Sequence, residues 1–146
     1  MGGLILPSKG SVYIDANIVI YAIEKIEPYA GLLAPLWLQA GEPSFTIITS
    51  ELTWLETLTK PLKDRNSALA ETYRSFLKAQ EMKLIPVSLA IWEEAAQLRC
   101  LGLKTPDALH AATAMNLACE LFLTNDKAFT RIPNLPVAVL GKFIQR

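Results

Sequence analysis

Short, continuous apolar runs separated by helix-like segments are the feature of this sequence that most restricts its fold. Most of the runs are continuous rather than alternating, as expected for strands covered on both faces. Helical periodicity between them predicts right-handed crossovers and a mainly parallel sheet. The sequence therefore predicts an α/β fold, a three-layer α/β/α sandwich whose five strands fall at 11–14, 44–48, 83–87, 121–124 and 137–140.

The segments between these runs predict helices at 17–26, 29–40, 50–60, 66–80, 89–101 and 106–119. The third helix is expected to end at Pro61, because proline removes a helical hydrogen bond. Pro86 within the third strand-like run favours an edge position in the sheet. The 146 residues contain no internal repeat or linker, so a single domain spanning 1–146 is expected, with residues 1–10 as a flexible N-terminus.

Composition narrows the class of protein. Hydrophobic residues make up 51% of the chain, which argues against intrinsic disorder, and no apolar run reaches the roughly 18–20 residues of a membrane span. Cys100 and Cys119 lack metal-ligand spacing and are expected to be buried, reduced thiols within helices. These features predict a cytoplasmic protein. Fourteen basic residues balance fourteen acidic ones, so any contact with nucleic acid needs a local basic patch.

Two aspartates follow strand-like runs, at the sheet edge where α/β folds bind their ligands. Asp15 directly follows the first run, and Asp126 comes shortly after the run 121–124. Each also precedes a helical segment, so each fits a helix N-cap as well as a ligand-binding carboxylate. The sequence leaves both interpretations open.

Two further acids lie on predicted helices. Asp107 falls in the first turn after Thr105 as N-cap and Pro106 as first helical residue, where the helix dipole also favours a carboxylate. Glu56 lies on the flank of a leucine stripe expected to face the core, and Glu51 lies nearer to that stripe. Periodicity does not choose between the two glutamates. The stripe consists of Leu52, Leu55, Leu58 and Leu62.

Together, Asp15, Asp107, Asp126 and one of the two glutamates, Glu56 or Glu51, indicate a divalent metal site. Clustered carboxylates raise one another's pKa unless a cation compensates their charge. Oxygen ligands suit Mg²⁺ or Mn²⁺, and the chain lacks the Cys/His set that zinc uses. Such ions activate water and neutralise charge on a phosphodiester during cleavage.

At these same four places the sequence resembles the PIN-domain family, most closely the VapC-type toxin ribonucleases of toxin–antitoxin pairs. The resemblance spans residues 11–140 and rests on four motifs in family-like order: YIDAN at 13–17, TSELTWLE at 49–56, TPDALHAATA at 105–114 and LTND at 123–126. It implies that Asp15, Glu56 rather than Glu51, Asp107 and Asp126 are the acids of the metal site.

The resemblance further implies a five-stranded parallel sheet, dependence on Mg²⁺ or Mn²⁺, endonucleolytic cleavage of RNA, homodimers and a small antitoxin partner. We expect the three aspartates to bind the metal, directly or through its waters, and Glu56 to join them or to orient the attacking water. Cleavage would leave a 3′-hydroxyl and a 5′-phosphate. The acids are expected to have polar neighbours that hydrogen-bond to them, namely Asn17, Thr124 and Asn125.

A basic cluster and a single histidine each allow two interpretations. Lys60, Lys63 and Arg65 follow the Glu56 helix and fit either contacts to the RNA backbone or a solvated turn. His110, the chain's only histidine, lies three residues after Asp107. Because the surrounding helix is apolar, we expect a packed, hydrogen-bonded side chain rather than a general base.

Three other classes of protein fit less well. A non-catalytic PIN-like module that binds RNA or protein has the same fold, but the intact acids disfavour it. A phosphoryl-receiving signalling domain needs an aspartate at the end of the middle strand, where the chain has Pro86, Val87 and Ser88. A nucleotide-binding Rossmann module needs a glycine-rich phosphate loop, and none follows any strand-like run.

Overall fold

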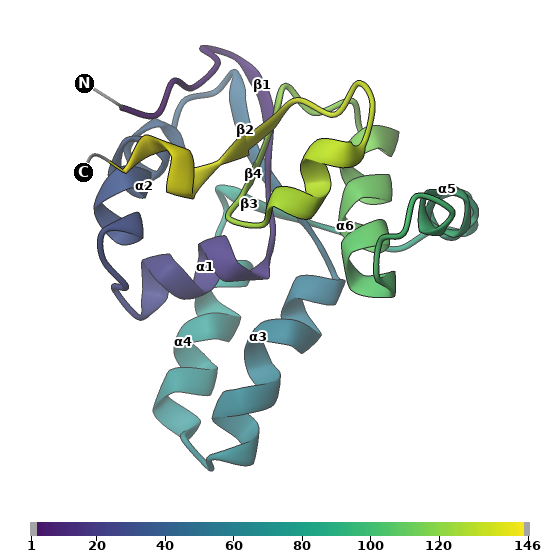
Figure 1. Cartoon of the computed structure of the whole chain (residues 1–146). Helices are drawn as coiled ribbons and strands as arrows, with labels where there is room; N and C mark the ends of the chain where they lie inside the picture. Colours follow the sequence, from purple (N-terminus) through teal and green to yellow (C-terminus); the bar gives the residue numbers. More distant parts are fainter. Residues whose placement is uncertain (1–2, 145–146) are drawn as a thin grey trace.

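The computed structural model describes residues 3–144, in which a parallel sheet lies between two helical layers (Figure 1). The strands pair in the order β3-β2-β1-β4-β5, and every neighbouring pair is parallel. β3 lies at an edge, which confirms the position predicted from Pro86, the residue that follows it. The strands are β1 (Gly10–Ile14), β2 (Phe45–Ser50), β3 (Met82–Ile85), β4 (Leu121–Thr124) and β5 (Val137–Val139).

Helices connect consecutive strands in pairs. They are α1 (Ala16–Ile23) and α2 (Tyr29–Gln39) before β2, α3 (Leu52–Lys63) and α4 (Ser67–Leu77) before β3, and α5 (Leu89–Arg99) and α6 (Thr105–Asn116) before β4. Short 3₁₀ helices, η1 (Lys127–Arg131) and η2 (Leu140–Phe143), precede and follow β5. Across residues 3–144, no helix is long and apolar enough to span a bilayer.

Alternating side chains along the strands explain why the apolar runs are continuous. In β1, Tyr13 packs against α5, α6 and η1, whereas Val12 and Ile14 pack against the opposite helical layer of α1, α2, α3 and α4. In β4, Phe122 and Leu123 divide between the same two layers. All five side chains are fully buried. Burial on both faces confirms the predicted three-layer sandwich.

Helix α3 does not bury the predicted leucine stripe. Leu55 and Leu62 are 62% and 54% exposed, so half of the stripe faces solvent. Threonines take part in the buried face because their hydroxyls find partners there: Thr53 bonds to Thr49 at 2.6 Å, and Thr57 donates to the Thr53 carbonyl at 2.8 Å. The buried residues of α3 are Thr53, Thr57, Leu58 and Pro61.

Several predicted helix ends are also wrong by a few residues, and α1, α4 and α6 each end three residues before their predicted ends, at Ile23, Leu77 and Asn116. Pro61 lies inside α3, which continues to Lys63, since a proline in the last turn removes only one hydrogen bond. Lys104 rather than Thr105 is the N-cap residue of α6, so Pro106 is the second helical residue. Asp107 keeps its predicted place in the first turn of α6.

Both cysteines are free thiols, as predicted, but only one is buried. Cys119 lies just after α6, and burial raises its pKa to about 11. Cys100 is exposed at the C-cap of α5, so the prediction of a buried thiol is wrong for this residue.

The N-terminal segment lies against the domain. Leu4 and Leu6 pack on the core layer that includes α1 and α2, and Gln39 Nε2 donates a hydrogen bond to the Pro7 carbonyl at 2.7 Å. Met1 and Gly2 lie outside the described residues, and flexibility of residues 1–10 stays a prediction.

Gly10 opens β1 with a φ of +93°, a conformation that side-chain-bearing residues rarely adopt. We expect Gly10→Ala to lower the free energy of unfolding by about 1–3 kcal/mol, chiefly through backbone strain. The added Cβ would also lie 2.5 Å from Glu120 Cγ, but that exposed side chain can move. Urea denaturation measures the effect. Gly41→Ala is the matched control, since a Cβ there meets nothing within 4 Å; equal losses in both variants would contradict the strain.

Candidate active site

An open pocket at the carboxyl edge of the sheet brings three of the four predicted acids together. Asp15, Glu56 and Asp107 line this pocket, along with Asn17 and His110, and its volume is about 300 Å³. Asp15 follows β1, Glu56 lies in the second turn of α3, and Asp107 lies in the first turn of α6. Three separate stretches of sequence therefore converge where parallel α/β folds bind ligands.

Asp15 is both a helix cap and a wall of the pocket. Its Oδ1 accepts a hydrogen bond from the Ile18 N–H at 3.3 Å, which caps α1, and its Oδ2 accepts one from Thr124 Oγ1 at 2.6 Å. Burial raises the pKa of Asp15 above its ordinary value, and His110 together with the hydrogen bonds from Thr124 and Ile18 partly offsets this effect. The two interpretations left open by the sequence are thus compatible.

Asp107 is half-buried and lacks a cationic partner among the ion pairs of residues 3–144. Burial raises its pKa, and the negative charges of Asp126 and Glu56 raise it further. His110 and, to a smaller extent, Lys104 lower this pKa, though not enough to reverse the shift. Ionisation of Asp107 is therefore less favourable in the metal-free protein than in water, and a nearby cation would favour it.

Glu56 is held by the histidine. His110 Nε2 lies 2.7 Å from Glu56 Oε1, and His110 Nδ1 lies 2.6 Å from the Tyr13 hydroxyl. The His110 side chain is only 3% exposed, against 27% for Glu56. This confirms a packed, hydrogen-bonded histidine, and it also shows a contact with the site that the spacing in sequence did not predict.

Asp126 lies beside the pocket rather than in its lining. Its Oδ1 accepts from the Ala128 N–H at 2.9 Å and caps η1, while its own N–H donates to Thr124 Oγ1 at 3.0 Å. Thr124 therefore connects Asp126 to Asp15. The charge of Asp126 still raises the pKa of Asp107, so the two carboxylates repel each other electrostatically.

Of the predicted polar neighbours, Asn17 lines the pocket and Thr124 bonds to Asp15, whereas the Asn125 side chain points elsewhere. Asn125 donates to the Tyr21 hydroxyl at 3.1 Å and accepts from the Gly141 N–H at 2.9 Å. It therefore ties the loop after β4 to α1 and η2. Asn125 supports the loop that carries Asp126 but does not contact the acids.

Glu51, the rival glutamate, lines a different hollow together with Trp54 and Leu84. It is exposed and forms the N-cap position of α3 without a side-chain capping bond. The geometry of α3 thus separates the two glutamates, and only Glu56 borders the pocket that holds the aspartates.

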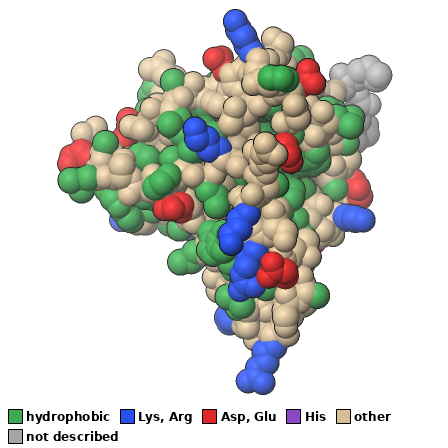
Figure 2. All heavy atoms as spheres, turned by 180° about the vertical axis from the view of Figure 1, so that it is seen from behind, with side chains coloured by type: hydrophobic (Ala, Val, Ile, Leu, Met, Phe, Trp, Pro, Cys, Tyr) green, Lys and Arg blue, Asp and Glu red, His purple; other side chains and the backbone are tan. Residues whose placement is uncertain are grey.

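The predicted basic cluster lies at the far end of α3. Lys60, Lys63 and Arg65 are exposed, and Lys60 pairs with Asp64 at 3.0 Å. Lys and Arg side chains gather over the hairpin of α3 and α4, at the bottom of the view in Figure 2. The three basic residues do not line the pocket of the acids.

The side chains that line the pocket are of the type that binds a divalent cation, although they are too far apart to form a ready metal site. In the described part of the chain, no three Asp, Glu, His or Cys side chains are close enough to form a ready metal site. The lining nevertheless offers carboxylate and amide oxygens, the donors that Mg²⁺ and Mn²⁺ prefer, and it contains no Lys or Arg. Asp15, Glu56 and Asp107 are the residues that would hold the ion.

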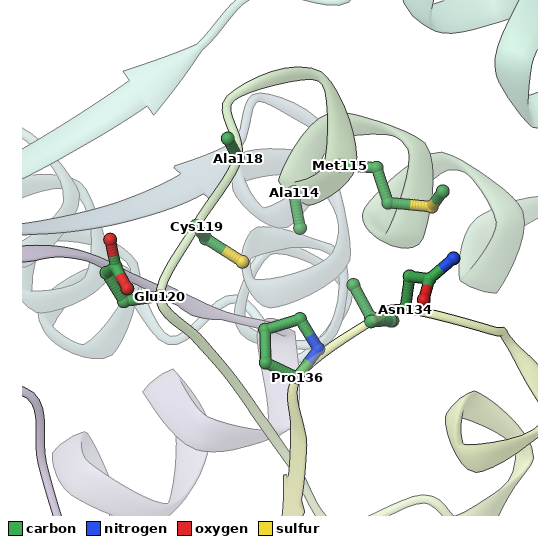
Figure 3. Close-up of a pocket in the computed structure, with 8 residues that line it drawn as sticks. Ala114, Met115, Ala118, Cys119, Glu120, Asn134 and Pro136 are labelled. Carbon is green, nitrogen blue, oxygen red and sulfur yellow. The ribbon is translucent and has the colours of Figure 1, made fainter.

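A larger hollow, of about 630 Å³, lies elsewhere (Figure 3). It is lined mostly by apolar side chains from the end of α6 and the segments that lead into β4 and β5, with Glu120 and Asn134 as its polar members. Because Glu120 immediately precedes β4, this hollow is at the opposite end of that strand from Asp126. Glu120 is the one acidic residue that lines this hollow, so the larger of the two hollows is not the one that holds the group of acids.

The PIN domain family model matches residues 12–135, and the chain therefore belongs to the PIN domain family. No curated protein matches the sequence significantly.

Solved structures show which members of the family are similar. VapBC2 from Rickettsia felis, bound to a DNA fragment from its promoter, is 25% identical with a TM-score of 0.71 over 88% of this chain and 98% of that one. A toxin–antitoxin complex from Klebsiella pneumoniae is 27% identical with a TM-score of 0.66 over 88% and 97%. VapBC-1 from nontypeable Haemophilus influenzae, at 17% identity, shares the fold with a TM-score of 0.70 over 90% and 98%.

Proposed function

We propose that this PIN domain is a Mg²⁺- or Mn²⁺-dependent endoribonuclease and the toxin of a toxin–antitoxin pair. The observation that carries the proposal is the convergence of Asp15, Glu56 and Asp107 in one pocket that no Lys or Arg lines. The similarity to proteins from toxin–antitoxin complexes supports a small antitoxin as partner. The resemblance to VapC toxins also supports a homodimer that acts in the cytoplasm.

In the proposed mechanism, the bound ion would supply Lewis acidity that activates water and neutralises charge on the phosphodiester. Asp15 and Asp107 would hold the ion, and Asp126 would add negative charge from beside the pocket. Glu56 either binds the ion as well or accepts a proton from the attacking water. Thr124 keeps the Asp15 carboxylate in one orientation through its 2.6 Å hydrogen bond.

RNA would contact the protein through local charge, since the net charge of the chain is zero. The hairpin of α3 and α4 carries the exposed residues Lys60, Lys63 and Arg65. Glu56 lies on α3, the first helix of this hairpin (Figure 1). An RNA strand bound in the pocket could therefore continue along the hairpin.

RNA cleavage by variants of two glutamates tests this proposal. Glu56 lies in the second turn of α3, and Glu51 lies at the N-cap position of the same helix. We expect purified protein to cleave RNA with Mn²⁺ and to stop when EDTA is added. Glu56→Gln should reduce cleavage at least about 100-fold, since a metal-site group contributes several kcal/mol. Glu51→Gln is the matched control and should cleave like the wild type, because Glu51 lines a different hollow. Equal cleavage by both variants would contradict the assignment of Glu56.

A non-catalytic PIN-like module that binds RNA or protein is the second candidate. The spacing of the acidic side chains favours a non-catalytic module, because within residues 3–144 they are too far apart to form a ready metal site. This function predicts that wild-type protein leaves RNA intact in Mn²⁺ and that Mn²⁺ does not raise its melting temperature. Cleavage that is lost in Glu56→Gln would exclude it.

A further inference from the structure

We propose that the exposed faces of α3 and α5 form the contact surface of a two-fold symmetric homodimer, in which α3 of one protomer packs against α5 of its partner. The inference deepens the proposed function, because it rests on the homodimer expected of such a toxin and assigns that homodimer a surface. The surface is separate from the acid pocket, since none of its exposed apolar side chains lines that pocket.

Both helices expose large apolar side chains to solvent. On α5, Leu89 is 84% exposed and Trp92 is 49% exposed. On α3, Leu55 and Leu62 are the two leucines that the core does not cover. The spacing of three residues on α5 and of seven on α3 places each pair on one face of its helix. Apolar patches that a monomer leaves exposed mark interaction sites, and tryptophan is among the residues that contribute most to binding.

Helix α6 contacts both α3 and α5 and so connects the two exposed faces. Residues of α5 and α6 line a groove of about 140 Å³, among them Trp92 and Ala96 of α5 and Ala108 of α6. A cavity of about 150 Å³ holds a benzene-sized group, so the groove can receive an aliphatic side chain from a partner's α3. In Figure 2, the outline is indented between the arm that α5 forms at the left and the hairpin of α3 and α4 at the bottom, and hydrophobic side chains lie on both sides.

The charges beside the two faces favour a second copy of the chain as the occupant. On α3, Glu51 lies one turn before the first exposed leucine, and Lys63 follows the second. On α5, Glu93 lies beside the tryptophan, and Arg99 ends the helix. Each face is thus acidic toward its start and basic toward its end, so α3 and α5 packed antiparallel place opposite charges together. None of these four exposed side chains forms an ion pair within residues 3–144.

Two-fold symmetry uses both faces at once. In an isologous interface, α3 meets the partner's α5 while α5 meets the partner's α3. Interfaces of standard size bury about 800 Å² per partner, which is about a tenth of the 8223 Å² accessible surface of this chain. A contact through both faces buries more of that area than one helix laid on α3 or α5 alone, which favours a second copy over a single partner helix.

Association of the full chain without RNA tests this surface. Sedimentation velocity of the wild type should show a dimer with a dissociation constant of about 1 μM or lower, as for interfaces of standard size. Leu55→Ala and Leu89→Ala should each weaken dimerisation at least about 30-fold, since each substitution occurs twice in a symmetric interface. Leu38→Ala is the matched control and should leave the dissociation constant unchanged. Leu38 is 84% exposed, like Leu89, but lies on α2 in the opposite helical layer.

Charge reversal tests whether α3 pairs with α5. Lys63→Glu and Glu93→Lys should each weaken the dimer about 10-fold or more, because each brings like charges together. The double variant restores opposite charges across the interface and should recover most of the lost affinity. RNA is left out of these measurements because Lys63 also lies on the proposed path of RNA.

The outcomes separate this inference from the proposed function. A wild-type chain that stays monomeric at about 100 μM, well above the expected dissociation constant, would leave both faces to an antitoxin or another protein and would overturn the inference. A dimer that either leucine variant leaves intact, or a double charge variant no tighter than the single ones, would also overturn it. RNA cleavage by the wild type in Mn²⁺ decides the proposed nuclease independently, since association is measured without metal or RNA.

Discussion

Asp107→Asn is expected to reduce metal-dependent RNA cleavage at least about 100-fold while raising the melting temperature of the metal-free protein. Cleavage falls because Asn offers a neutral amide in place of a charged ligand in the pocket that Asp15 and Glu56 share. Stability rises because burial, Asp126 and Glu56 together disfavour the ionised form of Asp107. Each kcal/mol of relieved repulsion would raise the melting temperature by about 2–4 °C.

One favourable interaction opposes this gain. Asp107 lies in the first turn of α6, where the helix dipole stabilises a carboxylate by about 0.3–1 kcal/mol. The pKa of Asp107 is nevertheless raised, chiefly by burial and by the charge of Asp126. In the metal-free protein, the ionised side chain therefore favours folding less than the protonated one does.

The stability difference between Asp107→Asn and the wild type should depend on pH in a defined direction. A carboxyl group whose pKa is raised by folding binds its proton more tightly in the folded chain, so its effect on stability becomes less favourable as pH rises from the unfolded to the folded pKa. The advantage of Asp107→Asn should thus be largest at neutral pH and shrink as pH falls toward about 4. Thermal melts in EDTA measure this trend.

Two comparisons complete that experiment. Adding Mn²⁺ should raise the melting temperature of the wild type and have much less effect on Asp107→Asn, since ligands stabilise the state that binds them. Asp64→Asn is a matched control, because Asp64 is exposed and paired with Lys60 at 3.0 Å away from the pocket. An equal, pH-dependent gain in Asp64→Asn would show that the effect belongs to overall charge rather than to the site.

The strands were predictable because burial on both faces leaves a strong pattern. β4 is apolar at Leu121, Phe122 and Leu123, and its predicted range of 121–124 matches the structure. The buried face of α3 was not predictable from hydrophobicity, since Thr53 and Thr57 are buried through hydroxyl bonds while Leu55 is exposed. Periodicity detects apolar faces and cannot detect a polar face whose hydrogen bonds are satisfied internally.

The candidate site was predictable in part for a similar reason. Strand ends and a helix start place Asp15 and Asp107 at one edge of the sheet, so their convergence follows from topology. The link from Tyr13 to His110 and Glu56 joins residues far apart in the chain, and no local signal marks it. The alternation of β1 does predict that Tyr13 faces the helical layer opposite to Val12, which is the signal that could have directed attention to His110.

Phe122→Ala is expected to cause the largest loss of stability, about 3–5 kcal/mol, and to lower the melting temperature by roughly 6–20 °C. Phe122 is fully buried at the centre of β4, between Tyr13 at 5.0 Å and Phe129 at 4.6 Å between ring centroids. Its removal leaves a cavity that two flanking rings cannot fill without moving. Domains of this kind are stable by only about 5–15 kcal/mol, so the loss is a large share of the total.

Chemical denaturation distinguishes this packing effect from a general response to truncation. Leu38→Ala is the control, because Leu38 is 84% exposed and its truncation should change the free energy of unfolding by less than about 0.5 kcal/mol. Phe122→Leu should retain part of the lost stability, since it refills the cavity without restoring the stack on Tyr13. If Phe122→Ala lost less than about 1 kcal/mol, the cavity would have closed, and the fixed orientation of Tyr13 would have to come from its bonds to Ser50 and His110.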